Sequence, residues 1–282
     1  METDGFDELA DLALSKSGQA LRRSQKYLIE ARLSHILRRE SFSSLSELSA
    51  CLLARPNPGF EDEVVAAMAD KKTSFFQDRN TLHHIVDTVL PDIVSRQEET
   101  GENDPIQILC AGGCTGQEAY SLAILLDEAD ETKLMGRAVE ILSIDMCKAS
   151  TARGQDGLYG HYEIQMGMSV HRMLKYFSRH DDAWQISEEI RNRVTFEDAN
   201  LMSPLDGLTS ADVILCRNVL PNMTTAMAMG LSKRLGGLLV REGFLFLGVE
   251  EVPAPGSGLV LSDGAVGAWY FDPDADQGTA AA

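Results

Sequence analysis

The sequence lacks the features of an exported or membrane-spanning protein. Its N-terminus, METDGFDELADLAL, is acidic and carries no positive charge ahead of an apolar run, unlike a secretory signal. No apolar run approaches the roughly 20 residues that cross a bilayer. The best candidate, 235–249, is interrupted by Arg241 and Glu242. We therefore expect a soluble, cytoplasmic protein.

Cysteine is scarce, and its spacing indicates no disulfide framework. The five cysteines are Cys51, Cys110, Cys114, Cys147 and Cys216. Without an export signal, reduced thiols are expected. Neither these cysteines nor the six histidines have the spacing of metal ligands, so we predict no metal site.

Positive charge is also in short supply, since 25 Lys and Arg face 43 Asp and Glu, a formal net charge of -18. General nucleic-acid binding needs a positive surface, so we expect no nucleic-acid partner. The exception is 16–39, where Glu30 is the one acid and apolar residues recur at helical spacing. Its basic residues are Lys16, Arg22, Arg23, Lys26, Arg32, Arg38 and Arg39. We predict a basic helix, which is either a solvated face or a docking surface for an acidic protein.

Two nucleotide-binding motifs are missing, GxGxxG and GxxxxGK[ST], which disfavours an NAD fold and excludes a P-loop. What is present is an alternation of strands and helices, typical of an α/β fold with a mainly parallel sheet. The expected strands are 106–111, 138–144, 194–196, 211–216 and 243–248. Helices are expected at 118–128 and 225–234, the latter ending at Gly236-Gly237, and 257–272 could add an edge hairpin.

Polar residues and glycines follow these strands, where ligands bind in open α/β sheets. A glycine loop, Gly112 to Gly116, follows the first strand, Asp145 the second, Asn200 the third and Asn218 the fourth. A carboxylate at the second strand end can accept both hydroxyls of a ribose. The pattern predicts a nucleoside-binding pocket.

Several motifs carry a family resemblance. In chain order they are TSFF at 73–76, AGGCTGQEAYS at 111–121, SID at 143–145, GLY at 157–159, NL at 200–201 and CRNVL at 216–220. Together they resemble the CheR-type chemotaxis-receptor glutamate O-methyltransferases. The resemblance implies a Rossmann-like S-adenosylmethionine-dependent methyltransferase sheet, with an N-terminal all-helical domain and a small inserted β region. We expect a helical domain at 1–70, a methyltransferase domain at 71–272 with the β insertion at about 176–196, and a flexible tail at 273–282.

The resemblance also implies that nine residues bind S-adenosyl-L-methionine. They are Thr73, Gly112, Gly113, Glu118, Asp145, Asn200, Leu201, Asn218 and Val219. Asp145 would hold the ribose, Asn200 and Leu201 would meet the adenine, and Glu118 would lie near the amino-acid end. Taken singly, Thr73 could instead cap a helix, and the two asparagines could be turn residues.

Two departures from the family lie at the expected substrate side, and we take both positions as candidate catalytic residues. The family's TxFF is followed by Arg, but here by Gln77; Asn222 replaces a tyrosine after CRNVL. Gln cannot make the bidentate, charge-assisted grip of Arg on a carboxylate. Arg79 could stand in only if it turned toward the site. A third departure is Glu242, which replaces a glycine.

A methyltransferase acting on glutamate needs no general base, because the carboxylate is ionised at neutral pH and positioning supplies the catalysis. The first hypothesis is therefore methyl transfer to the cytoplasmic helix bundle of a chemoreceptor, docked at 16–39. The alternatives are a regulatory protein that binds S-adenosylmethionine or S-adenosylhomocysteine without turnover, and a methyltransferase for another protein.

Overall fold

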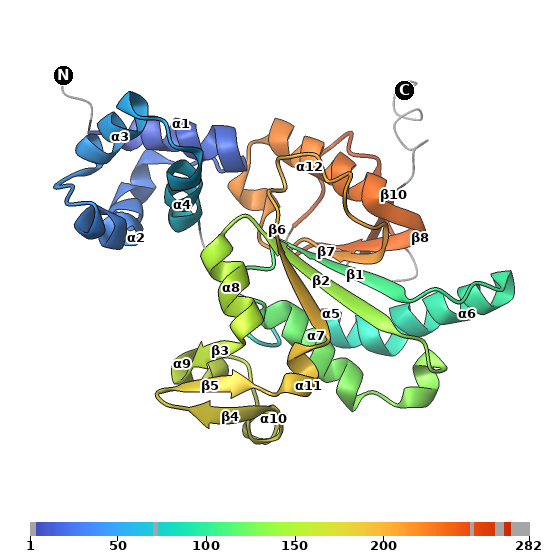
Figure 1. Cartoon of the computed structure of the whole chain (residues 1–282). Coiled ribbons are helices and arrows are strands. Elements are labelled where there is room, and N and C mark those ends of the chain that lie inside the picture. The colour runs from blue at the N-terminus through green and yellow to red at the C-terminus, as the bar shows by residue number, and fades with distance from the viewer. Residues whose placement is uncertain (1–3, 70–72, 249–250, 263–267, 272–282) are drawn as a thin grey trace, which may run out of the picture.

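The computed structural model describes residues 4–69, 73–248, 251–262 and 268–271. A helical part comes first in the chain and a sheet with its covering helices follows (Figure 1). The first part contains α1 (Phe6–Ser17), the 3-10 turn η1 (Arg23–Gln25), α2 (Lys26–Arg39), α3 (Leu45–Ala54) and α4 (Pro58–Met68). Side chains cap two of these helices: Ser44 accepts from Glu47 N and Asn57 from Phe60 N.

The prediction of one basic helix over 16–39 is wrong. Gly18, at φ 75°, adopts the left-handed conformation that ends α1, and α2 begins only at Lys26. The apolar faces of the helices still meet in one buried cluster, as their spacing indicates. Its largest members are Phe6, Leu9, Ile29, Leu33, Ile36, Leu48 and Met68.

A seven-stranded sheet forms the second part, in the order β6-β2-β1-β7-β8-β10-β9. The strands are β1 (Ile106–Ala111), β2 (Val139–Asp145), β6 (Val194–Asp198), β7 (Ala211–Leu215), β8 (Leu239–Phe246), β9 (Leu259–Leu261) and β10 (Ala268–Phe271). The first five are parallel, while β10 and β9 are antiparallel and end the sheet as a hairpin. The α/β fold and the edge hairpin are thus confirmed.

Helices cover both faces of this sheet (Figure 1). On one face lie α5 (Arg79–His84), the π-helical turn η2 (Ile85–Val89), α6 (Leu90–Thr100) and α7 (Gln117–Glu128). Pro91, which has no N–H to donate, follows the π turn within the same continuous helix. The other face is covered by α12 (Thr225–Leu238), and α8 (Lys148–Asp156) packs beside β6. Two short turns, η3 (Glu131–Leu134) and η4 (Leu220–Asn222), complete the connections.

Two sequence-based boundaries are wrong near the end of the sheet. The helix predicted to stop at Gly236-Gly237 runs on to Leu238, because Leu231 and Leu235 bury in the cluster beneath it and packing outweighs glycine's low helix propensity. The strand predicted from Gly243 begins at Leu239, with an irregularity between its pairings to Ala211 and Val213.

A small antiparallel sheet is inserted between α8 and β6 (Figure 1). It consists of β3 (Leu158–Gly160), β5 (Ala183–Ile186) and β4 (Phe177–His180), with α9 (His161–Gln165), α10 (Val170–Tyr176) and α11 (Glu188–Arg191) around it. The predicted span of about 176–196 is therefore too short at its start, because β3 pairs with β5 across a long sequence gap. Its end is too long, because Val194 to Phe196 belongs to the main sheet.

Within the described ranges, no helix is both long and apolar enough to cross a membrane. The tail predicted at 273–282 lies outside the described residues.

Candidate functional site

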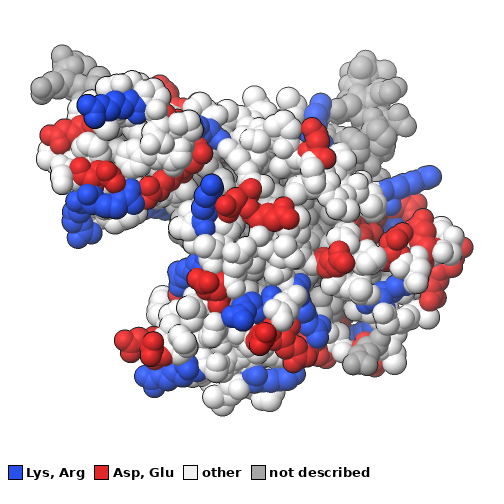
Figure 2. Space-filling model, in the orientation of Figure 1, with Lys and Arg blue, Asp and Glu red and all other residues white. Residues whose placement is uncertain are grey.

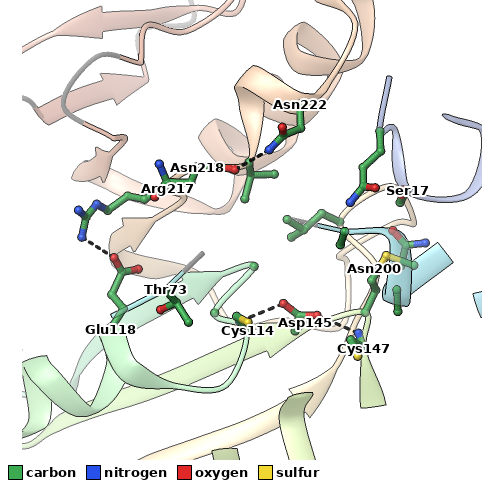
Figure 3. Close-up of a pocket in the computed structure, with 18 of the residues that line it drawn as sticks. Ser17, Thr73, Cys114, Glu118, Asp145, Cys147, Asn200, Arg217, Asn218 and Asn222 are labelled. Carbon is green, nitrogen blue, oxygen red and sulfur yellow. Dashed lines mark hydrogen bonds and ion pairs between the residues drawn. The ribbon is translucent and has the colours of Figure 1, made fainter. Parts of the chain in front are cut away.

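One pocket lies at the carboxyl ends of the parallel strands, and residues of the N-terminal helical part form one of its walls (Figure 3). All nine residues predicted to bind cofactor line it, and so do Gln77 and Asn222. Residues from the helical part that reach the same pocket are Ser17, Gln19, Ala66 and Ala69. Segments far apart in the sequence therefore converge here.

The glycine loop after β1 needs its glycines. The N–H groups of Gly112 and Gly113 both donate to the carbonyl of Ile144, at 2.9 Å each, which holds the loop against the end of β2. A Cβ on Gly113 would lie 2.0 Å from Ser143 Oγ. Gly112 has φ 78°, and its Cβ would lie 2.9 Å from Val219 Cγ2. Neither position accepts a side chain without rearrangement, so bare backbone faces the pocket.

Asp145, the last residue of β2, lies between two backbone donors (Figure 3). Its Oδ2 accepts from Cys114 N at 3.0 Å and its Oδ1 from Cys147 N at 2.8 Å. These bonds fix the carboxylate at the pocket edge. A carboxylate at this edge can accept hydrogen bonds from ligand hydroxyls.

A buried arginine ties three segments together next to the glycine loop. The side chain of Arg217, 3% exposed, donates through Nη1 to Glu118 at 2.6 Å and through Nη2 to Asp78. Glu251 lies close enough to interact with the same arginine, and its Oε2 accepts from Gly248 N. Burial raises the pKa of Glu118 and of Glu251, while the Arg217 charge opposes the rise. Three carboxyls face one cation here, an arrangement that suits a ligand with positive charge.

Asn200 joins the sheet to the helical part. Its Nδ2 donates to the carbonyl of Lys16 at 2.7 Å, and its Oδ1 accepts from Met202 N at 2.9 Å. The next residue, Leu201, is buried against the same side of the pocket. Asn200 is therefore a turn residue and a pocket residue at once.

Comparison with known proteins agrees with this geometry. Residues 71–255 match the family model "CheR methyltransferase, SAM binding domain". The chain belongs to this family. It is accordingly an S-adenosylmethionine-dependent methyltransferase.

Curated relatives match along most of their length. The chain is 28% identical to chemotaxis protein methyltransferase Cher2 of Pseudomonas putida, over 87% of this chain and 89% of that protein. It is 29% identical to chemotaxis protein methyltransferase 1 of Pseudomonas aeruginosa, over 86% and 89%. Among solved structures, magnesium protoporphyrin IX methyltransferase of Synechocystis PCC 6803 aligns with a TM-score of 0.31 at 17% identity, covering 68% of this chain and 70% of that one. A TM-score this low carries no argument about function.

The two departures at the expected substrate side, Gln77 and Asn222, lie together in this CheR-family chain. Gln77 Nε2 donates to Asn218 Oδ1 at 3.3 Å, and Asn222 Nδ2 donates to the Asn218 carbonyl at 2.9 Å. Arg79 does not stand in for an arginine at 77, because it donates to the carbonyl of Gly167 at 2.6 Å and does not line the pocket. Among the described lining residues, Arg217 is the one Lys or Arg.

Sequence reasoning missed several residues that line the pocket, and it also missed Asp78, which pairs with Arg217 beside it. Arg217 was quoted inside the CRNVL motif, yet its pairing with Asp78 and Glu118 depends on contacts across some 100 residues or more that no local pattern reveals. Asp78 directly follows Gln77 and has φ 51°, a left-handed conformation that Asp tolerates better than most residues. Ser17 and Gln19 reach the pocket only because α1 ends against the sheet.

Proposed function

We propose that this CheR-family methyltransferase moves the methyl group of S-adenosylmethionine to glutamate side chains of chemoreceptors, with the cofactor in the pocket at the strand ends. The observation that carries this is the convergence of all eleven predicted residues on one pocket. The names of its relatives, chemotaxis protein methyltransferases, support receptors as the substrate class.

Each part of the cofactor is assigned to residues that line the pocket and match it chemically. Asp145 would accept the ribose hydroxyls, since two backbone donors hold its carboxylate at the edge of the pocket. Asn200 and Leu201 would contact the adenine. Gly112 and Gly113 would let the backbone approach the ligand closely.

The acidic cluster would receive the cationic end of the cofactor. S-adenosylmethionine has a sulfonium and an ammonium group, which benefit from excess negative charge in a partly water-excluded site. Asp78, Glu118 and Glu251 supply that excess over Arg217. Thr73 and Val219 complete the wall.

The transfer step requires alignment and little else. A new bond forms from a glutamate oxygen to the methyl carbon as the sulfur–methyl bond breaks, and the electron pair of that bond stays on sulfur. The incoming carboxylate is ionised near neutral pH. The protein would therefore contribute by holding the two groups in line and excluding water, with Gln77 and Asn222, which both donate to Asn218, nearest to the incoming side chain.

Receptor docking would use the exposed part of the basic segment 16–39. Most of its cations already have acidic partners: Lys16 pairs with Glu61, Arg23 with Asp4 and Asp7, Lys26 with Asp4, and Arg39 with Glu63. Figure 2 accordingly has basic and acidic atoms intermixed over these helices. Among the described residues, Arg22 and Arg38 have no acidic partner within ion-pair distance. They are the cations left to attract an acidic helix bundle.

The test is a methylation assay with labelled S-adenosylmethionine and receptor-rich membranes from the same source. A base-labile methyl ester on a receptor is expected, because ester bonds to glutamate hydrolyse in alkali. Label on another protein would support the alternative of a methyltransferase with a different protein substrate. The absence of a methyl ester on every receptor would refute methyl transfer to chemoreceptors.

A second candidate function has its own observation. Gln77 and Asn222 are neutral and are hydrogen-bonded to Asn218. Because position 77 is glutamine, it has no guanidinium group to bind a substrate carboxylate. A protein that binds S-adenosylmethionine or S-adenosylhomocysteine without turnover would have such a site. Calorimetric binding together with no transfer would favour it.

A further inference from the structure

Gln19 occupies a fixed position in the pocket wall. Helix α1 ends at Gly18, where an added Cβ would lie 3.0 Å from Met202 Sδ. The residues directly after Gly18 pair with the segment that follows β7. Gln19 forms an isolated antiparallel bridge with Met223, and Ala20 N donates to the carbonyl of Asn222 at 2.7 Å. The backbone of Gln19 is thus anchored on the sheet side of the pocket.

The side-chain oxygen of Gln19 is buried and has no hydrogen-bond partner among the described residues. An amide oxygen shut away from water without a donor is unfavourable, and such an atom in a folded protein calls for an explanation. Gln19 lines the pocket, and a rotation of its amide group would turn this oxygen toward a donor on a ligand bound there.

The donors of the proposed ligand indicate which of them could bond to the side-chain oxygen of Gln19. S-adenosylmethionine offers two ribose hydroxyls, one ammonium group and the amino group of its adenine. The hydroxyls match Asp145, and the ammonium matches the carboxyls around Arg217. Asn200 uses both ends of its own amide on protein partners, since it donates to Lys16 and accepts from Met202. Gln19 Oε1 accepts from no described residue, so it is the side-chain oxygen that gains most from the adenine amino group.

We propose that the side-chain carbonyl of Gln19 accepts the amino group of the adenine and so selects adenine over other purines. Gln19 is then a specificity-determining residue contributed by the N-terminal helical part. This assignment rests on the proposed function, because it presumes that the cofactor lies in this pocket.

The experiment compares two ligands and two proteins by calorimetry. The ligands are S-adenosylhomocysteine and its analogue with hydrogen in place of the adenine amino group. The wild-type protein is expected to prefer the amino ligand about tenfold, the size of one buried hydrogen bond. Gln19→Met is expected to bind both within about twofold of each other, since a thioether is a poor acceptor.

Controls separate this inference from the proposed function. Gln165→Met, at an exposed position in α9, should keep the full preference. The thermal midpoint of ligand-free Gln19→Met should not fall, because the change removes a buried unpaired oxygen. If wild type binds S-adenosylhomocysteine but has no preference, or if Gln19→Met keeps the preference, the role of Gln19 is refuted while the cofactor assignment stands. If wild type binds neither ligand, the cofactor assignment itself fails, and the role of Gln19 fails with it.

Discussion

The cofactor side and the substrate side of the pocket are built differently. On the cofactor side, glycines without room for a Cβ and a carboxylate held by two backbone N–H groups leave few alternative arrangements. On the substrate side, the neutral side chains of Gln77 and Asn222 both donate to Asn218, the first to its side-chain oxygen and the second to its backbone carbonyl. The first side is specified by backbone geometry and tolerates little change. The second depends on exchangeable side chains, and it is where this chain departs from the family's motif.

Arg217 lies on the boundary between the two sides, and its removal should have the largest effect. Arg217→Met leaves Glu118 and Asp78 without their cation, so we expect a loss of about 3 kcal/mol in the free energy of unfolding, measured by urea titration. The control is Arg39→Met, whose pair with Glu63 is solvent-exposed and should be worth less than about 1 kcal/mol. Equal losses of unfolding free energy in the two variants would show that the buried cluster contributes no more to stability than an exposed ion pair does.

Asp145→Ala should nearly abolish cofactor binding. The change removes the acceptor of the ribose hydroxyls and leaves Cys114 N and Cys147 N without their carboxylate. We expect affinity for S-adenosylhomocysteine to fall by about 100-fold or more in calorimetry. Asp182→Ala, on an exposed turn, should bind as wild type does. Unchanged affinity in Asp145→Ala would show that the ligand lies elsewhere.

Gln77→Arg should affect the substrate side of the pocket and leave cofactor binding unchanged. A guanidinium can make charge-assisted bonds to the substrate carboxylate, so the rate of methyl transfer to receptors should rise about tenfold. Affinity for S-adenosylhomocysteine should stay within about twofold. Gln77→Met serves as the control for loss of the bond to Asn218, and it should not raise the rate. A fall in cofactor affinity with Gln77→Arg would mean that the two sides are not separable.

The acidic cluster predicts a pH effect that depends on ligand charge. Burial raises the pKa of Glu118 and of Glu251 from the ordinary glutamate value, so these carboxyls take up protons, and lose negative charge, at a higher pH than exposed glutamates do. From pH 8 to 5.5, affinity for cationic S-adenosylmethionine should therefore fall about fivefold relative to S-adenosylhomocysteine, which lacks the sulfonium charge. Glu118→Gln should flatten this ratio. A ratio that is independent of pH in wild type would exclude the cluster as the site of the sulfonium.

The smallest effect should come from the surface. Arg22→Glu/Arg38→Glu should raise the KM for receptor about threefold at low salt, with the difference shrinking as salt is added. Lys133→Glu/Arg137→Glu, near the start of β2 and away from the pocket, is the charge-matched control. The same KM in both double variants would show that docking does not use segment 16–39.

Much of the sheet could be predicted because its signals are local. The buried strands, the glycine loop and Asp145 follow one another within short stretches, and parallel strands bring their ends to one edge. Contacts between distant segments could not be predicted. Strand β3 escaped notice because three residues carry too little pattern, and the interrupted basic segment depended on Gly18 packing against Met202.

Glu242 is a further case, and it has a physical reason. It stands where the resemblance predicts a glycine, and its φ of 63° is one that a glycine would adopt without strain. Arg96 offsets part of that cost, because its Nη1 donates to both the carbonyl and the carboxylate of Glu242 at 3.0 Å. The sequence alone marked the departure but gave no sign of the arginine that accommodates it.

The bond from Asn200 to Lys16 and the pairing of Ala20 with Asn222 have a consequence for dissecting the protein. A fragment that starts after residue 70 would keep the sheet and every strand-end residue, yet it would lack Ser17 and Gln19 from the wall. Such a fragment would hold its ligand in a trough open on one side. The smallest unit able to enclose the nucleoside is therefore the two parts together.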